Sequence, residues 1–412
     1  MRPVENTIKF DIRVADLLAG LGYCLAPGAA YDLGPTLRRI WGSDRPTMVS
    51  ATLRSGFDLY LQALELPPGS EVLISAITHP DMVAIVRAQG FVPVPVDVDP
   101  ATMAPDPAAL RRAITPRAQV LVVAQLFGGH FDLADVLAVC RQHGLHLIED
   151  CAQTYGGGYR GHPQADISLF SFGPLKTGTA LGGAVMAVRD PAVHHRMTAI
   201  QAAYPVLPRR EFAKRLAKYA LLRAISNDAR KLGLLFAVLT GLGRDPGAEI
   251  RAWTRSLTGA FALSRFRSQL STPQVRLLAR RLAERGATWV SRRRTVGDRL
   301  AERLAGSERP GVQVRDHLHW LFPVMVGDPA MTIERLLTGG WLALPGLSNL
   351  DTFDPPPDRP EQSPHTARHI LARVLILPMH PTMTDADLAG MAAVVTADTA
   401  PIAVAPLPAN GK

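Results

Sequence analysis

Short apolar runs alternate with stretches of helical periodicity between residues 50 and 190. Runs typical of buried strands stand at 71–75, 91–97, 119–125 and 145–150, and helical spacing stands between them at 53–66, 82–89, 107–114 and 133–144. Strands that are apolar throughout are covered on both faces, so this alternation favours an α/β fold with a mostly parallel, doubly wound sheet. The prolines in 91–97 place that strand towards an edge of the sheet.

The pattern changes beyond residue 189. Leucine, alanine and basic residues dominate 212–242, and 272–304 predicts one or two basic helices. A strand at 320–326 and a last helix at 385–396 indicate a smaller α+β domain. We therefore expect four segments, which are an N-terminal segment (1–50), a large α/β domain (51–205), a basic leucine-rich helical insertion (206–270), and linking helices with a small C-terminal domain (271–412).

Composition narrows the class of protein. The chain has 412 residues, of which 47% are hydrophobic and 20% charged, as in globular proteins and unlike disordered ones. The N-terminus lacks the pattern of a signal peptide, and the three irregularly spaced cysteines predict reduced thiols in a cytoplasmic protein. Their spacing predicts no metal site. The apolar run at 232–243 is too short to span a bilayer.

The positive charge is local. Residues 205–310 contain 23 Lys and Arg against 8 Asp and Glu, whereas the rest of the chain is net negative. Such a segment is either a solvated helical face or a surface that meets anions. Binding to nucleic acid is not expected, because the basic helices lack interleaved aromatic residues and any known reader motif.

Lys176 is the strongest candidate for chemistry. It is the only basic residue between Ile167 and Val188, and an apolar setting lowers the pKa of a lysine and makes it a better nucleophile. The hydroxyl of Ser171 stands five residues earlier, glycines follow, and the strand that ends at Asp150 lies upstream. An acid, a hydroxyl and a lysine in this order suggest a site for pyridoxal 5'-phosphate (PLP), with the lysine as a Schiff base and the acid on the pyridine nitrogen.

Each neighbouring candidate also has an ordinary structural interpretation. Asp150 alone would be a helix cap or an arginine partner, and Gln153 alone a surface glutamine. The segment 54–57 opens a helix whose free N–H groups would suit a phosphate, although many helices begin in this way without a ligand. His79 follows a strand and could lie over a flat ring or hydrogen-bond locally, and His380 is similarly ambiguous.

Taken in order, five segments resemble the DegT/StrS-type sugar aminotransferases, a branch of the fold type I PLP enzymes. The resemblance runs, with interruptions, from about residue 31 to 395. The matching segments are Ser55-Gly56, residues 91–116, Glu149-Asp150-Cys151-Ala152-Gln153, residues 171–176 with 182–185, and Leu377-Pro378-Met379-His380-Pro381 with Thr384-Asp385. Each matching segment is weak evidence alone. The resemblance rests on the occurrence of all five in the order that the family has.

The resemblance implies the following roles. Lys176 forms the internal aldimine with PLP and later moves a proton, and Asp150 pairs with the pyridinium. Gln153 contacts the ring. Ser171 and the backbone of Gly56 and Phe57 hold the phosphate, with Ser55 in the same turn and His79 in the stacking position. Such enzymes take an amino group from glutamate or glutamine and transfer it to a ketone of a sugar or sugar-like substrate. They are typically homodimers, in which Arg267 or Gln269 would reach the partner's site.

Several positions depart from the family pattern. Phe57 replaces a threonine, His79 an aromatic residue and Thr177 an asparagine. These departures keep open a PLP-fold binding or regulatory protein without turnover. A PLP-dependent sugar dehydratase is a second alternative, although that branch commonly replaces the lysine by histidine. The extra segment 212–261 has no counterpart in the pattern, and its basic, leucine-rich part at 212–243 could meet a membrane surface peripherally.

Overall fold

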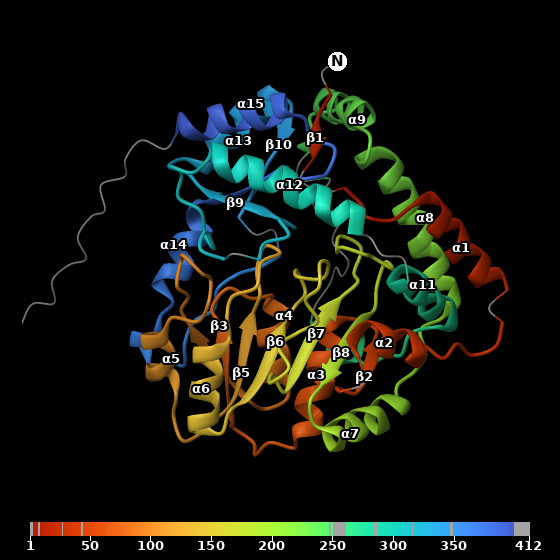
Figure 1. The fold of residues 1–412 in the computed structure, drawn as a ribbon, viewed down its shortest axis with the longest axis vertical. Coiled ribbons are helices and arrows are strands. Elements are labelled where there is room, and N and C mark those ends of the chain that lie inside the picture. The colour runs from red at the N-terminus through yellow and green to blue at the C-terminus, as the bar shows by residue number, and fades with distance from the viewer. Residues whose placement is uncertain are drawn as a thin grey trace, which may run out of the picture.

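A seven-stranded sheet forms the core of the lower half of the molecule in Figure 1, which shows the computed structural model. The structure describes residues 3–6, 9–26, 28–42, 44–246, 249, 261–283, 287–314, 316–346 and 349–398. The strands, in sheet order, are β2 (Thr47–Ser50), β8 (Ala184–Val188), β7 (Ile167–Ser171), β6 (His146–Asp150), β5 (Ala118–Ala124), β3 (Glu71–Ser75) and β4 (Val92–Val96). The five strands from β7 to β4 run parallel, and β8 is antiparallel to both of its neighbours.

Helices cover both faces of this sheet. One face packs against α3 (Leu53–Leu64), α4 (Pro80–Ala88) and α7 (Pro191–Ala202), and the other against α5 (Pro107–Ala113) and α6 (Ala134–His143). Alternate strand residues point to opposite faces, so Val72 packs with the first group and Leu73 with the second. The expectation of an α/β fold with a mostly parallel, doubly wound sheet is confirmed. The proline-containing strand β4 lies at the edge, as predicted.

The C-terminal part forms a second, smaller layer above the large sheet (Figure 1). Its antiparallel sheet has the order β11 (Leu344–Pro345), β12 (Val374–Leu377) and β9 (Phe322–Met325). The helices of this part are α13 (Pro329–Gly339), α14 (His365–Arg373) and α15 (Asp385–Thr396), with a short 3-10 turn at Pro360–Gln362. A second short 3-10 turn, at Leu263–Arg265, lies earlier in the chain, before the basic helices. The predicted last helix matches α15 in its bounds. A two-stranded parallel pair joins β1 (Glu5–Asn6) to β10 (Trp341–Leu342), so the start of the chain is part of the C-terminal layer.

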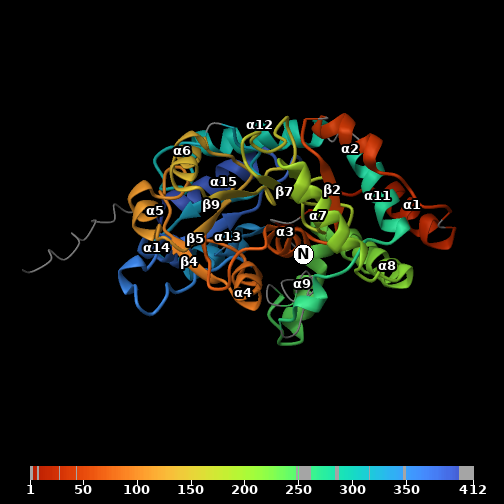
Figure 2. The same ribbon diagram turned by 90° about the horizontal axis from the view of Figure 1, so that it is seen from below.

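Long helices connect the two layers. The predicted basic helices are α11 (Thr272–Ala283) and α12 (Ala287–Arg303), and α12 runs across the C-terminal layer, where it packs against α15 (Figure 1). The leucine-rich segment forms α8 (Arg209–Ser226) and α9 (Ala229–Gly241), and α8 packs against α1 (Val14–Leu25) and α11. Figure 2 shows α8 and α9 at the side of the molecule, away from α5 and α6. The helix α2 (Gly34–Trp41) packs on β2.

The boundaries of the four expected segments stay a prediction. The large sheet takes in β2, which lies within the segment expected to be N-terminal. Much of the expected insertion beyond residue 246 lies outside the described residues.

Candidate active site

The loop that carries Lys176 follows the end of β7 at Ser171. Its turn is closed by the N–H of Lys176 donating to the carbonyl of Gly173 at 3.0 Å, and by the N–H of Thr179 donating to the carbonyl of Lys176 at 3.2 Å. Burial of the amine lowers the pKa of Lys176 to about 8, and the charge of Asp150 opposes this shift. A lysine in this state is partly neutral near physiological pH, as a nucleophile toward an aldehyde must be.

Asp150 ends β6, between the parallel strands β5 and β7. Its Oδ1 accepts the N–H of Ala152 at 2.9 Å, which holds the carboxylate at the carboxyl end of the sheet. Burial raises the pKa of Asp150, and the hydrogen bond from Ala152 and the charge of Lys176 act in the opposite direction. The acid and the amine therefore lie close enough to influence each other's protonation.

His79 and Arg54 complete the polar group around Lys176. The Nδ1 of His79 accepts the N–H of Asp81 at 3.1 Å, so its imidazole also caps α4. Arg54 forms an ion pair with Asp81 and lies 3.4 Å from the Nε2 of His79. Burial, with a smaller contribution from Arg54, lowers the pKa of His79 to about 4. The ring is therefore neutral at physiological pH and fixed in orientation. We refer to Lys176, Asp150, His79 and Arg54 as the strand-end cluster.

Gln153 and Ser171 occupy defined positions near this cluster. The Oε1 of Gln153 accepts the N–H of Phe127 at 2.6 Å, so the buried amide is oriented by the loop after β5. Phe127 has a positive φ of 62°, which a non-glycine residue adopts only when its surroundings fix it. Ser171 is half-buried, and the N–H of Gly173 lies 3.4 Å from its hydroxyl. The ordinary interpretation of Gln153 as a surface residue is wrong.

The start of α3 differs from what the sequence suggested. Thr52 caps the helix by accepting the N–H of Ser55 at 3.1 Å, and its carbonyl accepts the N–H of Gly56 at 3.1 Å. Phe57 lies within the helix, where its N–H bonds to the carbonyl four residues earlier, and its ring is fully buried in the core. The N–H groups of Gly56 and Phe57 are therefore not free for a phosphate. The first two N–H groups of the helix, those of Leu53 and Arg54, have no partner within it.

Gly56 has a packing role instead. A Cβ at this position would overlap the sulfur of Met186 on β8 and would lie 3.2 Å from the hydroxyl of Ser50 on β2. The absence of a side chain lets α3 approach the sheet closely. The resemblance of Ser55-Gly56 to a phosphate-binding turn thus coincides with a steric requirement of the fold.

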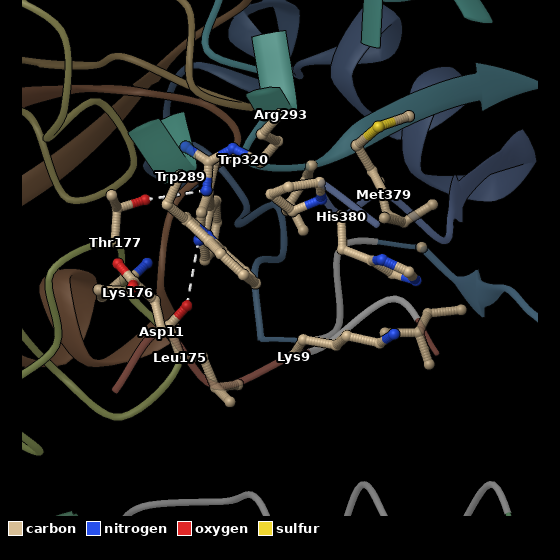
Figure 3. Close-up of a pocket in the computed structure, with 15 residues that line it drawn as sticks. Lys9, Asp11, Leu175, Lys176, Thr177, Trp289, Arg293, Trp320, Met379 and His380 are labelled. Carbon is tan, nitrogen blue, oxygen red and sulfur yellow. Dashed lines mark hydrogen bonds between the residues drawn. The ribbon is translucent and has the colours of Figure 1, made fainter. Parts of the chain in front are cut away.

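A cavity lies between the lysine loop and the C-terminal layer (Figure 3). Lys176 and Thr177 contribute to it from the loop, and Trp289 and Arg293 from α12. The remaining lining residues are Lys9, Asp11, Leu175, Trp320, Leu321, Leu344, Gly346, Ile376, Met379, His380 and Pro381. Sequence reasoning did not single out Asp11, Arg293 or Trp320, because each stands far along the chain from the lysine and carries no local motif. His380, which was ambiguous in the sequence, also lines this cavity.

Arg267 and Gln269 are both engaged within their own chain. Arg267 forms a two-point ion pair with the buried carboxylate of Asp58, at 3.0 and 3.2 Å. The amide of Gln269 donates to the carbonyls of Tyr204, at 2.7 Å, and Ala202, at 3.3 Å. Both residues therefore have structural roles in the single chain, and their approach to a partner's site stays a prediction.

The described residues fit PLP in their chemistry. An amine with a pKa of about 8 suits bonding to an aldehyde, and a nearby half-buried carboxylate suits a pyridinium. A neutral, oriented imidazole provides a flat surface, and a helix N-terminus with Arg54 provides positive potential for a phosphate. Among the described residues there is no cluster of side chains that could hold a metal ion.

The comparisons with known proteins agree with this geometry. Residues 47–214 match the model of the DegT/DnrJ/EryC1/StrS aminotransferase family, which confirms the resemblance seen in the sequence. The chain is 38% identical over 146 residues to the L-glutamine:2-deoxy-scyllo-inosose aminotransferase of Micromonospora echinospora, a match that covers 34% of each chain. It is 35% identical over 147 residues to the UDP-N-acetyl-3-dehydro-alpha-D-glucosamine 3-aminotransferase of Acidithiobacillus ferrooxidans, covering 35% of this chain and 40% of the relative. The chain thus matches only about a third of the length of these curated relatives.

Likeness in fold extends over nearly the whole chain. The aminotransferase TlmJ from Streptoalloteichus hindustanus superposes with a TM-score of 0.68 at 19% identity, and the match covers 96% of this chain and 98% of TlmJ. This likeness identifies the fold as that of the type I PLP enzymes. The lysine, the acid and the first strand of the sheet all lie inside the family-matched residues, whereas the cavity residues on α12 and beyond lie outside them.

Proposed function

We propose that this chain, whose residues 47–214 match the model of the DegT/DnrJ/EryC1/StrS aminotransferase family, is a PLP-dependent aminotransferase. The observation that carries the proposal is the pairing of Lys176 and Asp150 at the carboxyl end of the large sheet. Each residue perturbs the pKa of the other, and the amine has a pKa of about 8. This arrangement meets the two chemical requirements of such a cofactor, and it lies within the family-matched residues.

PLP supplies, when bound, an aldehyde that bonds an amine and a ring that accepts electrons from the attached carbon. Lys176 would hold the aldehyde through its Nζ and, once displaced by a donor amine, would use the same nitrogen to accept and return a proton. Asp150 would keep the pyridine nitrogen protonated through its carboxylate. His79 would lie against the ring, and Gln153 would contact its edge through the amide. Ser171, Ser55 and the first N–H groups of α3 would bind the phosphate.

The substrates that we propose are an amino acid donor, glutamate or glutamine, and a keto group of a sugar or sugar-like acceptor. One relative, 38% identical, is named for amino transfer from L-glutamine to an inosose. Another, 35% identical, is named as an aminotransferase of a 3-dehydro amino sugar. Both acceptors are polyhydroxylated rings with one ketone. A homodimer is part of the same proposal, and light scattering on the purified protein tests it.

Borohydride reduction followed by peptide mass mapping tests the cofactor and its lysine together. The expected result is a pyridoxyl group on Lys176 in the wild type and none in K176A. Lys214 is an exposed lysine of α8, so K214A serves as the matched control and should retain the label. An unlabelled Lys176 after incubation with excess PLP would overturn the proposal.

Exposure to a donor separates the proposal from its alternatives. An aminotransferase should convert its bound cofactor to pyridoxamine 5'-phosphate when glutamate or glutamine is added, with a change in the absorption spectrum. A PLP-fold binding or regulatory protein should show no such change. A sugar dehydratase would consume the keto sugar without transferring an amino group, and the retention of Lys176 favours transfer.

Peripheral membrane contact through residues 212–243 is also part of the proposal, and exposed apolar side chains of α8 and α9 support it. Leu221, Leu234, Val238 and Leu242 are each more than half exposed, and basic residues of α8 and α9 stand beside them. No helix of the described part of the chain has the length and apolar character needed to cross a membrane. Sedimentation with anionic liposomes at low salt is expected for the wild type and not for L234S/V238S. Val312, exposed elsewhere, gives the control V312S, and equal sedimentation of the wild type and both variants would refute the contact.

A further inference from the structure

A buried guanidinium on α12 has an unused donor group. Arg293 is only 5% exposed, and its Nε donates to the carbonyl of Leu318 at 2.8 Å. Its Nη1 donates to the hydroxyl of Thr177 at 3.1 Å, next to the catalytic candidate Lys176. Its Nη2 is buried and has no hydrogen-bond partner among the residues that the structure describes. A buried cationic donor without a partner costs free energy, so a ligand that completes it would be stabilised there.

The acids near Arg293 are already engaged. Asp11 is the carboxylate that acts on it electrostatically. The Oδ2 of Asp11 accepts the N–H of Gly178 at 2.6 Å, and its Oδ1 lies 3.4 Å from Arg281. Lys9, on the opposite side of the cavity in Figure 3, forms an ion pair with Glu5 at 2.9 Å. The cavity therefore contains a guanidinium whose charge is incompletely paired.

The position of this guanidinium relative to Lys176 defines the ligand class. Arg293, Lys176, Trp289 and Trp320 line the same cavity (Figure 3). The indole N–H of Trp320 donates to the carbonyl of Leu175 at 3.1 Å, which fixes the ring beside the lysine. An amino acid donor carries a carboxylate on the carbon that bears its reacting amine. A donor whose amine meets the cofactor at Lys176 would therefore place its α-carboxylate near Thr177. The guanidinium of Arg293, which is hydrogen-bonded to Thr177, would then be within reach of that carboxylate.

We propose that Arg293 binds the α-carboxylate of the amino donor. The inference rests on the proposed aminotransferase function and names a binding residue for its first substrate. Thr177 and Leu318 hold two edges of the guanidinium, so that Nη2 is presented to the ligand in a fixed direction. Thr177 stands where the family pattern has asparagine, and its hydroxyl gives this substitution a specific role as the acceptor that positions Arg293.

Binding of unreactive donor analogues tests the proposal on the holoenzyme. L-2-hydroxyglutarate keeps both carboxylates of glutamate and lacks the amine, whereas 4-hydroxybutanoate lacks the α-carboxylate as well. Isothermal titration of the wild type should show tighter binding of L-2-hydroxyglutarate. In R293M its dissociation constant should rise about 10- to 100-fold, the size expected for a charged hydrogen bond, and that of 4-hydroxybutanoate should not change. R293K keeps the charge and should fall between the wild type and R293M.

A matched control comes from the next residue of the same helix. Arg294 is about half exposed and pairs with Asp316 at 2.8 Å, so R294M should bind both analogues as the wild type does. Wild-type affinity of folded R293M for L-2-hydroxyglutarate would overturn the inference. If R293M fails to fold, R293K and T177V carry the test: R293K removes Nη2 while it keeps the charge, and T177V removes the hydroxyl that holds Nη1 and so positions the guanidinium.

The donor half-reaction, run without any acceptor, separates this inference from the function on which it rests. A raised KM for glutamate in R293M, with no change for 4-aminobutanoate, supports a donor site. An unchanged donor half-reaction in R293M would refute it and leave an acidic acceptor as the ligand of Arg293. If the wild type binds the analogues but no amino acid alters the cofactor spectrum, the aminotransferase proposal fails while the carboxylate site stands.

Discussion

The amine nitrogen of Lys176 lies 4.0 Å from the centroid of the Trp320 ring. Lys176 lies in the loop between β7 and β8 of the large sheet, whereas Trp320 precedes β9 of the C-terminal sheet. A cation over an indole face is stabilised, so Trp320 favours the protonated amine while burial disfavours it. The candidate site is therefore completed by the packing of the two layers against each other.

The pH dependence of cofactor attachment should report the pKa of Lys176. Because burial lowers that pKa from its usual 10.5 to about 8, the neutral, nucleophilic form is gained as pH rises through about 8. We expect the rate at which the cofactor-free protein takes up PLP to rise with a midpoint near that pH. Stopped-flow absorbance measures the rate, and a midpoint near 10 would contradict the buried setting of the amine.

Removing the charge of Asp150 should shift this midpoint downward. Asp150 raises the pKa of Lys176, so D150N leaves burial and the charge of Arg54 to act without opposition. The same substitution should also lower turnover by at least about 100-fold, because an amide cannot keep the pyridine nitrogen protonated. Asp135 is an exposed acid in the first turn of α6, and D135N is the control that should leave both quantities unchanged. An unchanged midpoint in D150N would show that the two groups are not coupled.

The Asp58–Arg267 pair should be important for stability. Asp58 is fully buried and also accepts hydrogen bonds from the amides of Gln62, at 2.8 Å, and Gln89, at 2.7 Å. Replacing Arg267 by alanine leaves a buried carboxylate without its cation, which we expect to cost about 3 kcal/mol in the free energy of unfolding.

Urea denaturation of R267A measures this cost. The exposed pair of Arg210 and Glu211, 3.6 Å apart, provides the control R210A, with an expected loss below about 0.5 kcal/mol. If R267A loses no more free energy of unfolding than the control R210A, the two glutamines suffice to stabilise the buried Asp58.

Substitution of Gly56 should separate packing from ligand binding. In G56A the new methyl group would overlap the sulfur of Met186, and we expect a loss of about 1–3 kcal/mol from overpacking. At Gly22 in α1 an added methyl group would meet nothing within 4 Å, so G22A should instead stabilise the protein by about 0.5–1 kcal/mol. Thermal unfolding compares the two variants, and full stability of G56A would show that α3 can move away from the sheet at little cost.

Acid should weaken the contact between the N-terminal segment and the C-terminal layer. A hydrogen bond from His380 at 2.8 Å lowers the pKa of Glu5 to about 2, and Lys9 adds to this effect. A lowered carboxyl pKa stabilises the fold above the ordinary value of 4.5, and this contribution is lost as pH falls towards 2. After solvent screening of this half-buried group, we expect about 1–2 kcal/mol.

Denaturation between pH 6 and 3 tests this contribution. E5Q should be less stable than the wild type at pH 6, and the difference should diminish on acidification. Glu334 on α13 is exposed, and E334Q should follow the wild type throughout. A difference between E5Q and the wild type that does not vary with pH would show that protonation of Glu5 is not its source.

The sequence predicted the parts of the structure that depend on local pattern. The apolar runs of the large sheet and the helix Asp385–Thr396 were located to within a few residues, because each stretch carries its own periodicity. Asp150 was found because it stands at the end of such a run, and Lys176 because it is the only basic residue between Ile167 and Val188. Arg293 and Trp320 were not found, because only the packing of α12 and of the loop before β9 brings them to the lysine. Gly56 was assigned a ligand role since the steric limit set by Met186 is invisible in a single segment.

The pairing of β1 with β10 also affects how the protein is made. Residues Glu5 and Asn6 leave the ribosome early, but their strand partners, Trp341 and Leu342, emerge only after most of the chain has been synthesised. The N–H groups of Val4 and Phe10 donate to Ala229 and Asn227, which are likewise synthesised much later. Because Lys9 and Asp11 follow β1 and line the cavity, that wall is completed late in biosynthesis. All seven strands of the large sheet are therefore synthesised before the residues of the C-terminal layer that complete the cavity.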